Sequence, residues 1–579
     1  MPSSTPSSGP LTALTTRASS AGTAAKVLLS SGIIKPYSPL ALARVLKLLK
    51  DWGTGPAGGF MAMATLLPDR VWISDERGDL TWAEVDERTD RLARALQGLG
   101  VDEGSSVAVM ARNHRGFLEI TVAAAKLGAD LLYLNTAFAG PQLVEVLERE
   151  DPTVVVHDEE FTDLVADAHV ETRVLAWVDS EVEENGARTS LDRLIEGEAR
   201  GGARLPAPEH HSRIIILTSG TTGTPKGAPR NEAGVDAAIS LMSRMPLRQG
   251  WSVHIAAPLF HTWGYAHMML SLLLGHTLVL RRRFDPEGAL RTVDEQGCEG
   301  FVVIPVMLQR ILGLPEEVLE RYSLRTVQVV AASGSALPGD LALTWMDHFG
   351  DNLYNTYGST EVAYASIATP EDLRESPSSA GKPPWATVVK IYDEKSDREL
   401  PAGESGRIFV GNSLLFEGYT GGGHKDMIDG LMSSGDVGRF DEDGRLHIEG
   451  RDDDMIVSGG ENVFPQEVEN CLARHEAVVE VAAIGVDDDE FGKRLKAFVV
   501  LQSGASASED DLKEHVKRNL ARYKVPREIV VIDELPRNAT GKVLKRELAD
   551  RGGDSAEQDS GGQDSGAQES EDSGQTAAT

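Results

Sequence analysis

Predicted helices and short apolar strands alternate along this 579-residue chain between residues 61 and 550. Residues 81–99 have a helical pattern, residues 106–111 form an apolar run typical of a buried strand, and residues 116–127 are again helical. The alternation continues with further β-branched segments at residues 153–156, 214–217, 301–304 and 326–331. It predicts an α/β fold in which largely parallel strands are covered by helices.

The predicted elements become shorter from about residue 450 onward, where helices at 467–475 and 508–519 surround strands at 478–485 and 496–501. We therefore expect a large multi-subdomain α/β body over residues 61–450 and a small, mobile α+β domain over residues 451–550, joined by a hinge. Residues 551–579 hold no branched aliphatic or aromatic residue and are expected to be a disordered acidic tail.

Charge and composition exclude several classes of protein. The net charge of −32 argues against nucleic acid as the main partner, because phosphates would be repelled. No apolar run reaches the roughly 18 residues of a membrane-spanning helix. Two cysteines, Cys298 and Cys471, are too few for a disulfide scaffold or a cysteine-based zinc site. These properties favour a cytoplasmic protein that acts on small molecules.

Residues 1–60 form an N-terminal extension whose first 50 residues contain no Asp or Glu. They carry six basic residues: Arg17, Lys26, Lys35, Arg44, Lys47 and Lys50. We expect no fixed structure in residues 1–25. A helix is predicted from Ser38, which can cap it, with Pro39 in its first turn. Two interpretations are open: this helix packs on the body, or it is a basic amphipathic helix that makes weak peripheral contact with an anionic membrane.

Residues 217–227 are a loop rich in Gly, Ser and Thr that follows a predicted strand. Its glycines permit tight turns, and their N–H groups, five hydroxyls and Lys226 make a cradle for an anion. The loop is not a Walker A sequence, because Pro225 stands where Gly is needed and Gly227 where Ser or Thr is needed.

The segment from Ser219 to Gly227 resembles the signature of the adenylate-forming superfamily, which includes acyl-CoA synthetases, luciferases and adenylation domains. Segments similar to the family's other motifs follow in its order at residues 332–337, 357–361, 434–436, 449–453, 458–463 and 536–542. The resemblance covers about residues 65–550, and so many matches in one order leave little room for coincidence. It implies an acid–CoA ligase that uses ATP, Mg²⁺ and coenzyme A.

The resemblance also implies the residues of the site. The residues expected to bind the nucleotide are Thr218, Ser219, Gly220, Gly223, Lys226, Gly334, Ser335, Ala336, Tyr357, Gly358, Thr360, Asp436, Arg451, Gly459 and Gly460. The residues expected to act in catalysis are Thr221, Thr222, His261, Glu361 and Lys542, with Asp453 as the hinge. The residue types suit these roles, since Tyr357 offers adenine a ring face, Glu361 offers Mg²⁺ a hard carboxylate and Asp436 can accept the ribose hydroxyls.

The region around His261 bears on the acid substrate. In the family this segment lies beside the acyl carboxylate, and domains that activate amino acids have Asp where this chain has His261. The spacing of the neighbouring histidines, His254, His267 and His276, does not suit a helical metal site. Apolar residues predict an acyl pocket: Trp263, Tyr265, Met268, Met269, Val362 and Ala363. We expect a medium- or long-chain fatty acid. The alternatives are an aryl-acid CoA ligase, a fatty-acyl-AMP ligase and a non-enzymatic, membrane-attached nucleotide-binding scaffold.

Overall fold

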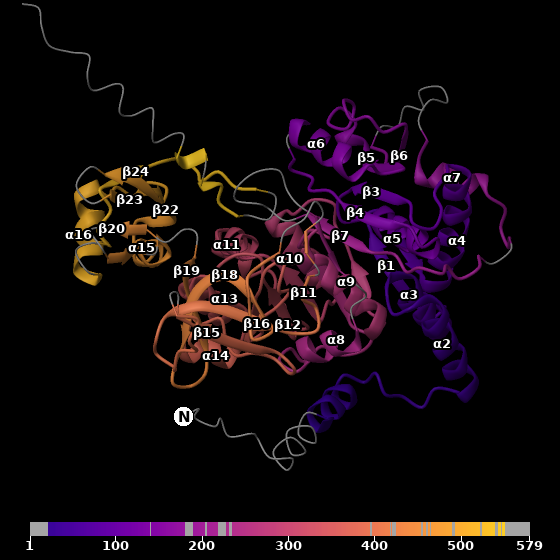
Figure 1. Cartoon of the computed structure of the whole chain (residues 1–579), viewed down its shortest axis with the longest axis horizontal. Coiled ribbons are helices and arrows are strands. Elements are labelled where there is room, and N and C mark those ends of the chain that lie inside the picture. Colours follow the sequence, from indigo (N-terminus) through magenta and orange to yellow (C-terminus); the bar gives the residue numbers. More distant parts are fainter. Residues whose placement is uncertain are drawn as a thin grey trace, which may run out of the picture. The chain divides into compact units, whose positions relative to one another are not determined.

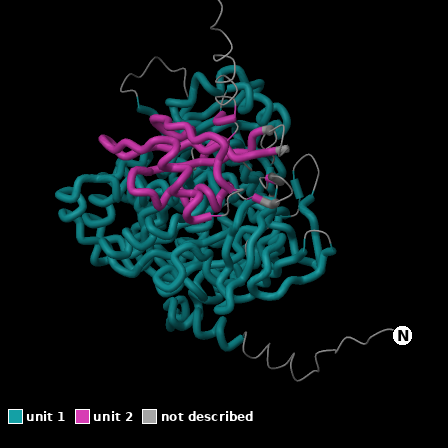
Figure 2. The backbone as a smooth tube through the Cα atoms, turned by 90° about the vertical axis from the view of Figure 1, so that its left-hand side faces the viewer, with its two compact units in different colours: residues 1–455, 538–542 teal, residues 456–537, 543–579 magenta. Residues whose placement is uncertain are grey.

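The computed structural model describes residues 21–138, 140–179, 189–202, 205–217, 227–230, 234–393, 396–416, 418–419, 424–452, 456–458, 461–463, 465–488, 492–520, 524–538, 542–545 and 547–549. The chain divides into two compact units (Figure 2). The large unit holds residues 1–455 and 538–542, and the small unit holds residues 456–537 and 543–579. A large α/β body and a small C-terminal domain are therefore confirmed.

The N-terminal extension is largely helical where it is described. Residues 21–30 are helical, which corrects the expectation of no fixed structure for residues 21–25. Helix α2 (Pro39–Trp52) starts as predicted, because the Ser38 hydroxyl accepts the backbone N–H of Ala41 at 3.1 Å and caps the first turn. Helix α3 (Pro56–Leu66) follows beside it (Figure 1) and is buried over most of its length.

A six-stranded sheet is built from the first part of the body, in the order β6-β5-β3-β4-β7-β8. Its strands are β3 (Ser106–Met110), β4 (Asp130–Tyr133), β5 (Val154–Asp158), β6 (Thr172–Trp177), β7 (Ile214–Leu217) and β8 (Gly227–Arg230). The helices of this part are α4 (Trp82–Gly98), α5 (Arg115–Lys126), α6 (Gly140–Glu150) and α7 (Leu191–Gly197). Five strands are parallel, as predicted, and β8 returns antiparallel to β7.

An eight-stranded sheet follows, in the order β14-β13-β12-β11-β9-β10-β1-β2. Its strands are β1 (Val71–Asp75), β2 (Gly78–Thr81), β9 (Ser252–Ile255), β10 (Thr277–Val279), β11 (Gly300–Val303), β12 (Val329–Ala332), β13 (Leu353–Tyr357) and β14 (Ser366–Ala368). Its helices are α8 (Val235–Met242), α9 (Thr262–Leu274), α10 (Pro286–Glu295), α11 (Pro305–Leu312), α12 (Glu316–Leu319), α13 (Gly339–Phe349) and α14 (Pro370–Glu375). Only the edge strands β2 and β14 pair antiparallel.

One hydrophobic core joins these two sheets. Strand β3 shows how, because Val107 and Val109 belong to the shared core while Ala108 and Met110 face a second cluster that includes residues of α6. In the shared core the rings of Trp72 and Trp82 stack with their centroids 4.8 Å apart, and the ring of Phe60 lies tilted against both. Within the described residues, no helix is long and apolar enough to span a bilayer.

A third sheet of the large unit is antiparallel and was not predicted from the alternation. It contains β15 (Val388–Tyr392), β16 (Gly406–Gly411), β17 (Met427–Ile428), β18 (Leu431–Phe440) and β19 (Leu446–Arg451). Strand β18 contains Ser, Gly, Asp and Arg residues, so its hydropathy is too weak to indicate a strand. Residues 434–436 and 449–451 of the predicted motifs lie in this sheet.

In its described residues the small unit is a five-stranded sheet covered by helices α15 and α16, and residues 545 and 547–549 near its end are also helical. Its elements are β20 (Ile456–Ser458), β21 (Glu461–Val463), α15 (Pro465–Leu472), β22 (Val478–Asp488), β23 (Gly492–Leu501), α16 (Glu509–Asn519) and β24 (Glu528–Val531). The helices and strands predicted here are present, but β22 and β23 are longer than predicted because they pair with each other up to Asp488 and Gly492. A separate core holds the unit together.

Candidate active site

The carboxyl ends of β9, β11, β12 and β13 lie at one edge of the eight-stranded sheet, because these strands are parallel. The chain leaves β12 into residues 333–336 and leaves β13 into residues 358–361, while His261 precedes the first residue of α9. The fold therefore brings together predicted residues that lie far apart in the sequence: His261, Gly334, Ser335, Ala336, Tyr357, Gly358, Thr360 and Glu361.

The turn after β13 is tightly packed against its own backbone. A Cβ added to Gly358 would lie 2.2 Å from the carbonyl oxygen of Ala363, closer than real atoms approach. Ala363 itself has a φ of 61°, a conformation that non-glycine residues rarely adopt. The Ser359 hydroxyl accepts the backbone N–H groups of Glu361 and Val362, each at 3.3 Å. This turn holds the backbone of Glu361 in place.

Tyr357 connects the eight-stranded sheet to the antiparallel sheet. Its hydroxyl donates to Oδ2 of Asp436 at 2.5 Å and lies 3.1 Å from the Ser434 hydroxyl. Burial raises the pKa of Tyr357 well above its usual value, so the hydroxyl stays protonated and remains a donor. The ring predicted to face adenine is thus anchored through its hydroxyl to the carboxylate predicted to hold the ribose.

Asp436 is a buried carboxylate with cations around it. It pairs in register with Arg451 across β18 and β19, and Arg451 Nε lies 3.6 Å from Asp436 Oδ1. Burial raises the pKa of Asp436, and the positive charges of Arg451, Lys542 and Lys425 oppose that rise. The sequence did not single out Lys425, since it follows a stretch of glycines and belongs to none of the quoted motifs. Three cations near one carboxylate suit a polyanionic ligand with a hydroxylated sugar.

Glu361 is held by a residue that the sequence did not identify. The Tyr419 hydroxyl donates to Glu361 Oε1 at 2.7 Å, and the backbone N–H of Phe416 donates to the Glu361 carbonyl at 2.9 Å. The rings of Phe416 and Tyr419 meet edge to face with centroids 4.8 Å apart. Among the described residues, Tyr419 donates to one of the two oxygens of this carboxylate. A carboxylate oxygen of this kind fits Mg²⁺.

The segment 538–542, which ends with Lys542, is grouped with the large unit, although the residues before and after this segment belong to the small one (Figure 2). Asn538 fixes the local turn, since its side-chain oxygen accepts the N–H of Lys542 at 2.9 Å and its own N–H donates to the Lys542 carbonyl at 2.9 Å. Burial raises the pKa of Asp436, and the positive charge of Lys542 acts on that carboxyl against the rise, as the charge of Arg451 does. The structure therefore brings Lys542 to the same carboxylate as Arg451.

His261 lies at the start of α9 with its Nε2 atom buried and unpartnered among the described residues. Burial lowers its pKa to about 3, so the imidazole is neutral near pH 7. His267, one and a half turns later, meets the ring of Trp263 edge to face at 4.6 Å, and burial lowers its pKa to about 3 as well. Within the described part of the chain no cluster of His, Cys, Asp and Glu could hold a metal ion.

Part of the predicted site lies outside the described residues. These residues are Thr218, Ser219, Gly220, Thr221, Thr222, Gly223, Lys226, Asp453, Gly459 and Gly460. The strands that flank the glycine-rich loop are described, and Leu217 of β7 pairs with Gly227 of β8. Ala228 of β8 packs in one cluster with Val362 and Ala365, which border the Glu361 turn. The two ends of the loop are therefore held beside that turn.

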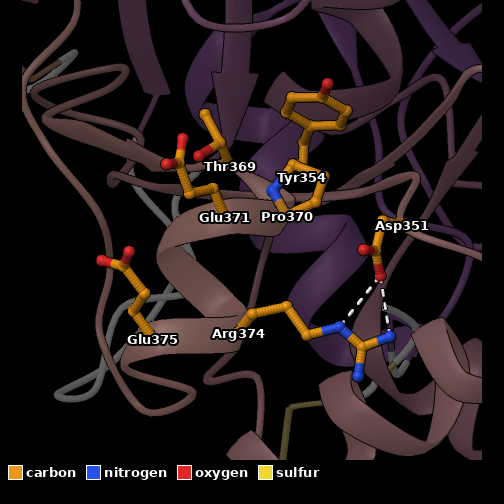
Figure 3. A pocket seen from close by; sticks show the side chains of 7 residues that line it. All are labelled: Asp351, Tyr354, Thr369, Pro370, Glu371, Arg374 and Glu375. Carbon is orange, nitrogen blue, oxygen red and sulfur yellow. Dashed lines mark hydrogen bonds and ion pairs between the residues drawn. The ribbon is translucent and has the colours of Figure 1, made fainter.

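An open pocket of about 580 Å³ lies elsewhere on the large unit (Figure 3). Asp351, which precedes β13, and residues of α14 line it, so it lies at the end of β13 opposite Tyr357. Arg374 donates to Asp351 from Nε at 2.9 Å and from Nη2 at 2.7 Å. Its guanidinium is already paired, and this pocket is not part of the candidate site.

Two family models match the chain. The AMP-binding enzyme model covers residues 60–420, and the model of the AMP-binding enzyme C-terminal domain covers residues 467–542. Feruloyl-CoA synthase from Amycolatopsis sp. is 32% identical over 484 residues, which are 82% of this chain and 94% of that protein. Indoleacetate–CoA ligase from Aromatoleum aromaticum is 30% identical over 504 residues, 84% of this chain and 96% of that protein.

A solved structure supports the same assignment. The o-succinylbenzoate-CoA synthetase of Bacillus subtilis, in complex with its acyl-adenylate intermediate, matches with a TM-score of 0.73 and 27% sequence identity. The match covers 85% of this chain and 97% of that one. The large and small units therefore correspond to the fold of an enzyme that was captured with an acyl-adenylate.

Proposed function

The chain belongs to the AMP-binding enzyme family, and we propose that it is an aryl-acid–CoA ligase. As an acid–CoA ligase it activates a carboxylic acid with ATP as an acyl adenylate and transfers the acyl group to coenzyme A. The proposal concerns the acid. Its main support is α9, which presents two half-buried aromatic side chains, Trp263 and Tyr265, just after His261.

The relatives favour an aromatic acid over a fatty acid. The apolar residues near His261 predict a fatty acid from the sequence, but the relatives above are ligases for ferulate, indoleacetate and o-succinylbenzoate. Aromatic side chains such as Trp263 pack well edge to face against a substrate ring. The unpartnered Nε2 of His261 suits a substrate with a polar group, since a buried polar atom left unpaired is costly. We therefore place an aryl acid first and a fatty acid second.

The described residues can perform the first half-reaction by positioning and charge. The carboxylate of the acid attacks the α-phosphorus of ATP, and pyrophosphate leaves. This chemistry needs in-line placement and neutralisation of charge rather than a covalent bond to the protein. We assign ribose binding to Asp436 and Arg451 and the adenine contact to Tyr357. Lys542 and Lys425 would compensate the negative charge that develops.

Magnesium fits Glu361, because a carboxylate supplies the hard oxygen ligands that this cation prefers. A bound Mg²⁺ supplies positive charge that screens the phosphates from the incoming carboxylate. Tyr419 orients the carboxylate by donating to its Oε1 atom. The loop with Thr221, Thr222 and Lys226 stays assigned to the phosphates as part of the proposal, because its flanking strands are held beside the Glu361 turn.

We propose that the two units act as the moving parts of the enzyme, with Asp453 as the hinge. The boundary between the units falls after residue 455, two positions beyond Asp453, which supports this assignment. Rotation there would expose the adenylate to the thiol of coenzyme A after pyrophosphate has left. We also propose that the enzyme is cytoplasmic and able to touch a membrane peripherally.

The function is tested by pyrophosphate release and thioester formation with a panel of acids. We expect aromatic acids with a cinnamate, arylacetate or benzoate skeleton to exceed octanoate and palmitate in kcat/KM by at least about tenfold, a difference within the range that pocket contacts provide. Preference for the aliphatic acids would restore the fatty-acid assignment. Adenylate release without thioester formation would favour an acyl-AMP ligase.

The two tyrosines of the site provide a matched prediction. Tyr419→Phe removes the donor to Glu361, and Tyr357→Phe removes the donor to Asp436. A hydrogen bond to a charged group contributes about 1.5–3 kcal/mol. Losing it should therefore weaken the binding of Mg²⁺ in the first variant, and of ATP in the second, about tenfold or more. We expect Tyr419→Phe to raise the Mg²⁺ concentration needed for half-maximal adenylation. Tyr357→Phe should raise the KM for ATP instead.

Direct binding separates these effects from turnover. Electron paramagnetic resonance of Mn²⁺ with ATP should show weaker metal binding in Tyr419→Phe and nearly unchanged metal binding in Tyr357→Phe. Equal shifts of metal binding in both variants would mean that Tyr419 has no particular role in placing Glu361.

A further inference from the structure

The N-terminal extension exposes an unusual amount of apolar surface. Ten large hydrophobic side chains are exposed in the described chain, and five of them lie between residues 29 and 46. They are 43–68% exposed: Leu29, Ile34, Leu40, Leu42 and Leu46. Single exposed leucines are ordinary on protein surfaces, but a group of five within one short segment indicates an interaction site.

The same segment is basic. Five cationic side chains are exposed in it, namely Lys26, Lys35, Arg44, Lys47 and Lys50, and the first acidic residue of the chain is Asp51. Asp51 forms an ion pair with Lys47, so four of the five charges have no acidic partner within the segment. We call these ten apolar and basic side chains the N-terminal basic face.

The opposite side of the extension is already used for folding. Val27 and Trp52 are buried in the large core, and Leu28, Ile33 and Leu48 pack against it. On α2, Leu46, Lys47 and Lys50 point away from Leu48 and Trp52, because successive residues rotate by about 100°. The extension is therefore attached through its buried side chains, and the ten side chains of the N-terminal basic face stay exposed. The interpretation that this helix packs on the body is therefore confirmed, and the membrane interpretation stays a prediction.

We propose that the N-terminal basic face is a docking surface for a membrane that contains anionic lipids. Leucine side chains can enter the acyl region while the lysine and arginine stems extend their charges to the phosphates of the head groups. A second copy of the same face would place like charges opposite each other. The rest of the protein, which holds all 89 acidic residues, faces an electrostatic penalty that salt screens beyond about 8–10 Å. Binding is thus weak and reversible, and it decreases with salt.

The test is cosedimentation of the full-length protein with vesicles, which requires no turnover. We expect binding to vesicles of phosphatidylcholine with 25% phosphatidylglycerol at about 50 mM salt, loss of most of it at about 500 mM, and little binding to pure phosphatidylcholine. Arg44→Gln with Lys50→Gln should weaken binding about 25-fold, because each charge near an anionic surface contributes about fivefold. Leu40→Ser with Leu46→Ser should weaken it at least about tenfold.

A control variant replaces two exposed apolar side chains by serine at a site outside the N-terminal basic face. Val388 and Met427 are 48% and 51% exposed on the antiparallel sheet, so Val388→Ser with Met427→Ser should leave vesicle binding unchanged. All three double variants should keep the thermal stability of the parent and its thioester formation from a soluble acid, so the result does not depend on which acid the ligase takes. Failure of the parent to bind at low salt would overturn the proposal, as would equal binding to both vesicle types or an equal loss in the control variant. Light scattering that shows a dimer abolished by the leucine changes, without vesicle binding, would assign the face to a second copy.

Discussion

Lys542→Ala is expected to abolish most of the adenylation activity and to spare the transfer of the acyl group. Loss of one preorganised electrostatic group at a reacting centre lowers kcat by about 10²–10³-fold. Lys542 is placed by the Asn538 turn, and its charge acts on Asp436, the carboxylate that Tyr357 and Arg451 also contact. That location suits the α-phosphate half-reaction. The thiol attack occurs after pyrophosphate has left and needs less positive charge.

The two half-reactions are measured separately. Exchange of labelled pyrophosphate into ATP reports adenylation, and thioester formation from supplied acyl adenylate reports transfer. Lys545→Ala is a matched control, because it removes a lysine three residues away that pairs with Glu469 in the small unit at 3.1 Å. It should leave both half-reactions within a few-fold of the parent, since its ion pair with Glu469 lies within the small unit. Equal loss of exchange and transfer in Lys542→Ala would contradict the assignment.

Gly358→Ala is expected to lower the adenylation rate by a similar factor, because the added methyl group has no room. Gly358 does not have a positive φ, so an alanine meets no backbone strain of its own. Its Cβ would nevertheless lie 2.2 Å from the Ala363 carbonyl oxygen and 2.7 Å from the Tyr364 Cα, and backbone atoms cannot rotate away. The turn must open by about an ångström, and displacements of that size cost about 10²-fold in rate. Glu361 and Tyr357 would move with the turn.

Gly98→Ala is the control for this substitution. Gly98 ends α4, and nothing lies within 4 Å of a Cβ placed there. Alanine at this position should leave pyrophosphate exchange unchanged and keep or slightly raise the melting temperature, since alanine is favoured over glycine in helices by about 0.5–1 kcal/mol. Circular dichroism should show Gly358→Ala folded. Full exchange in that variant would mean that the turn does not position Glu361.

The local elements could be read from the sequence because they depend on short-range signals. Ser38 caps α2, and Thr81 caps α4 in a capping box with Glu84. The parallel strands β3, β5, β7 and β11 were predicted within one or two residues, since buried strands are continuous apolar runs. The antiparallel sheet was missed because its strands are rich in glycine and polar residues. The helix at residues 21–30 was missed because its composition resembles that of a disordered segment.

The sequence by itself determined the family, the α/β class and the types of residue that carry the chemistry, because these are properties of short motifs and of hydropathy patterns. Only the tertiary structure decided which side chains meet. Tyr419 reaches Glu361 across 58 positions and Tyr357 reaches Asp436 across 79, and no local pattern encodes contacts of that range. Lys425 was identified as a site residue only in the structure, because its positive charge acts on Asp436. The physical reason is that hydrogen bonds and charges act over a few ångströms in space, whatever the distance along the chain.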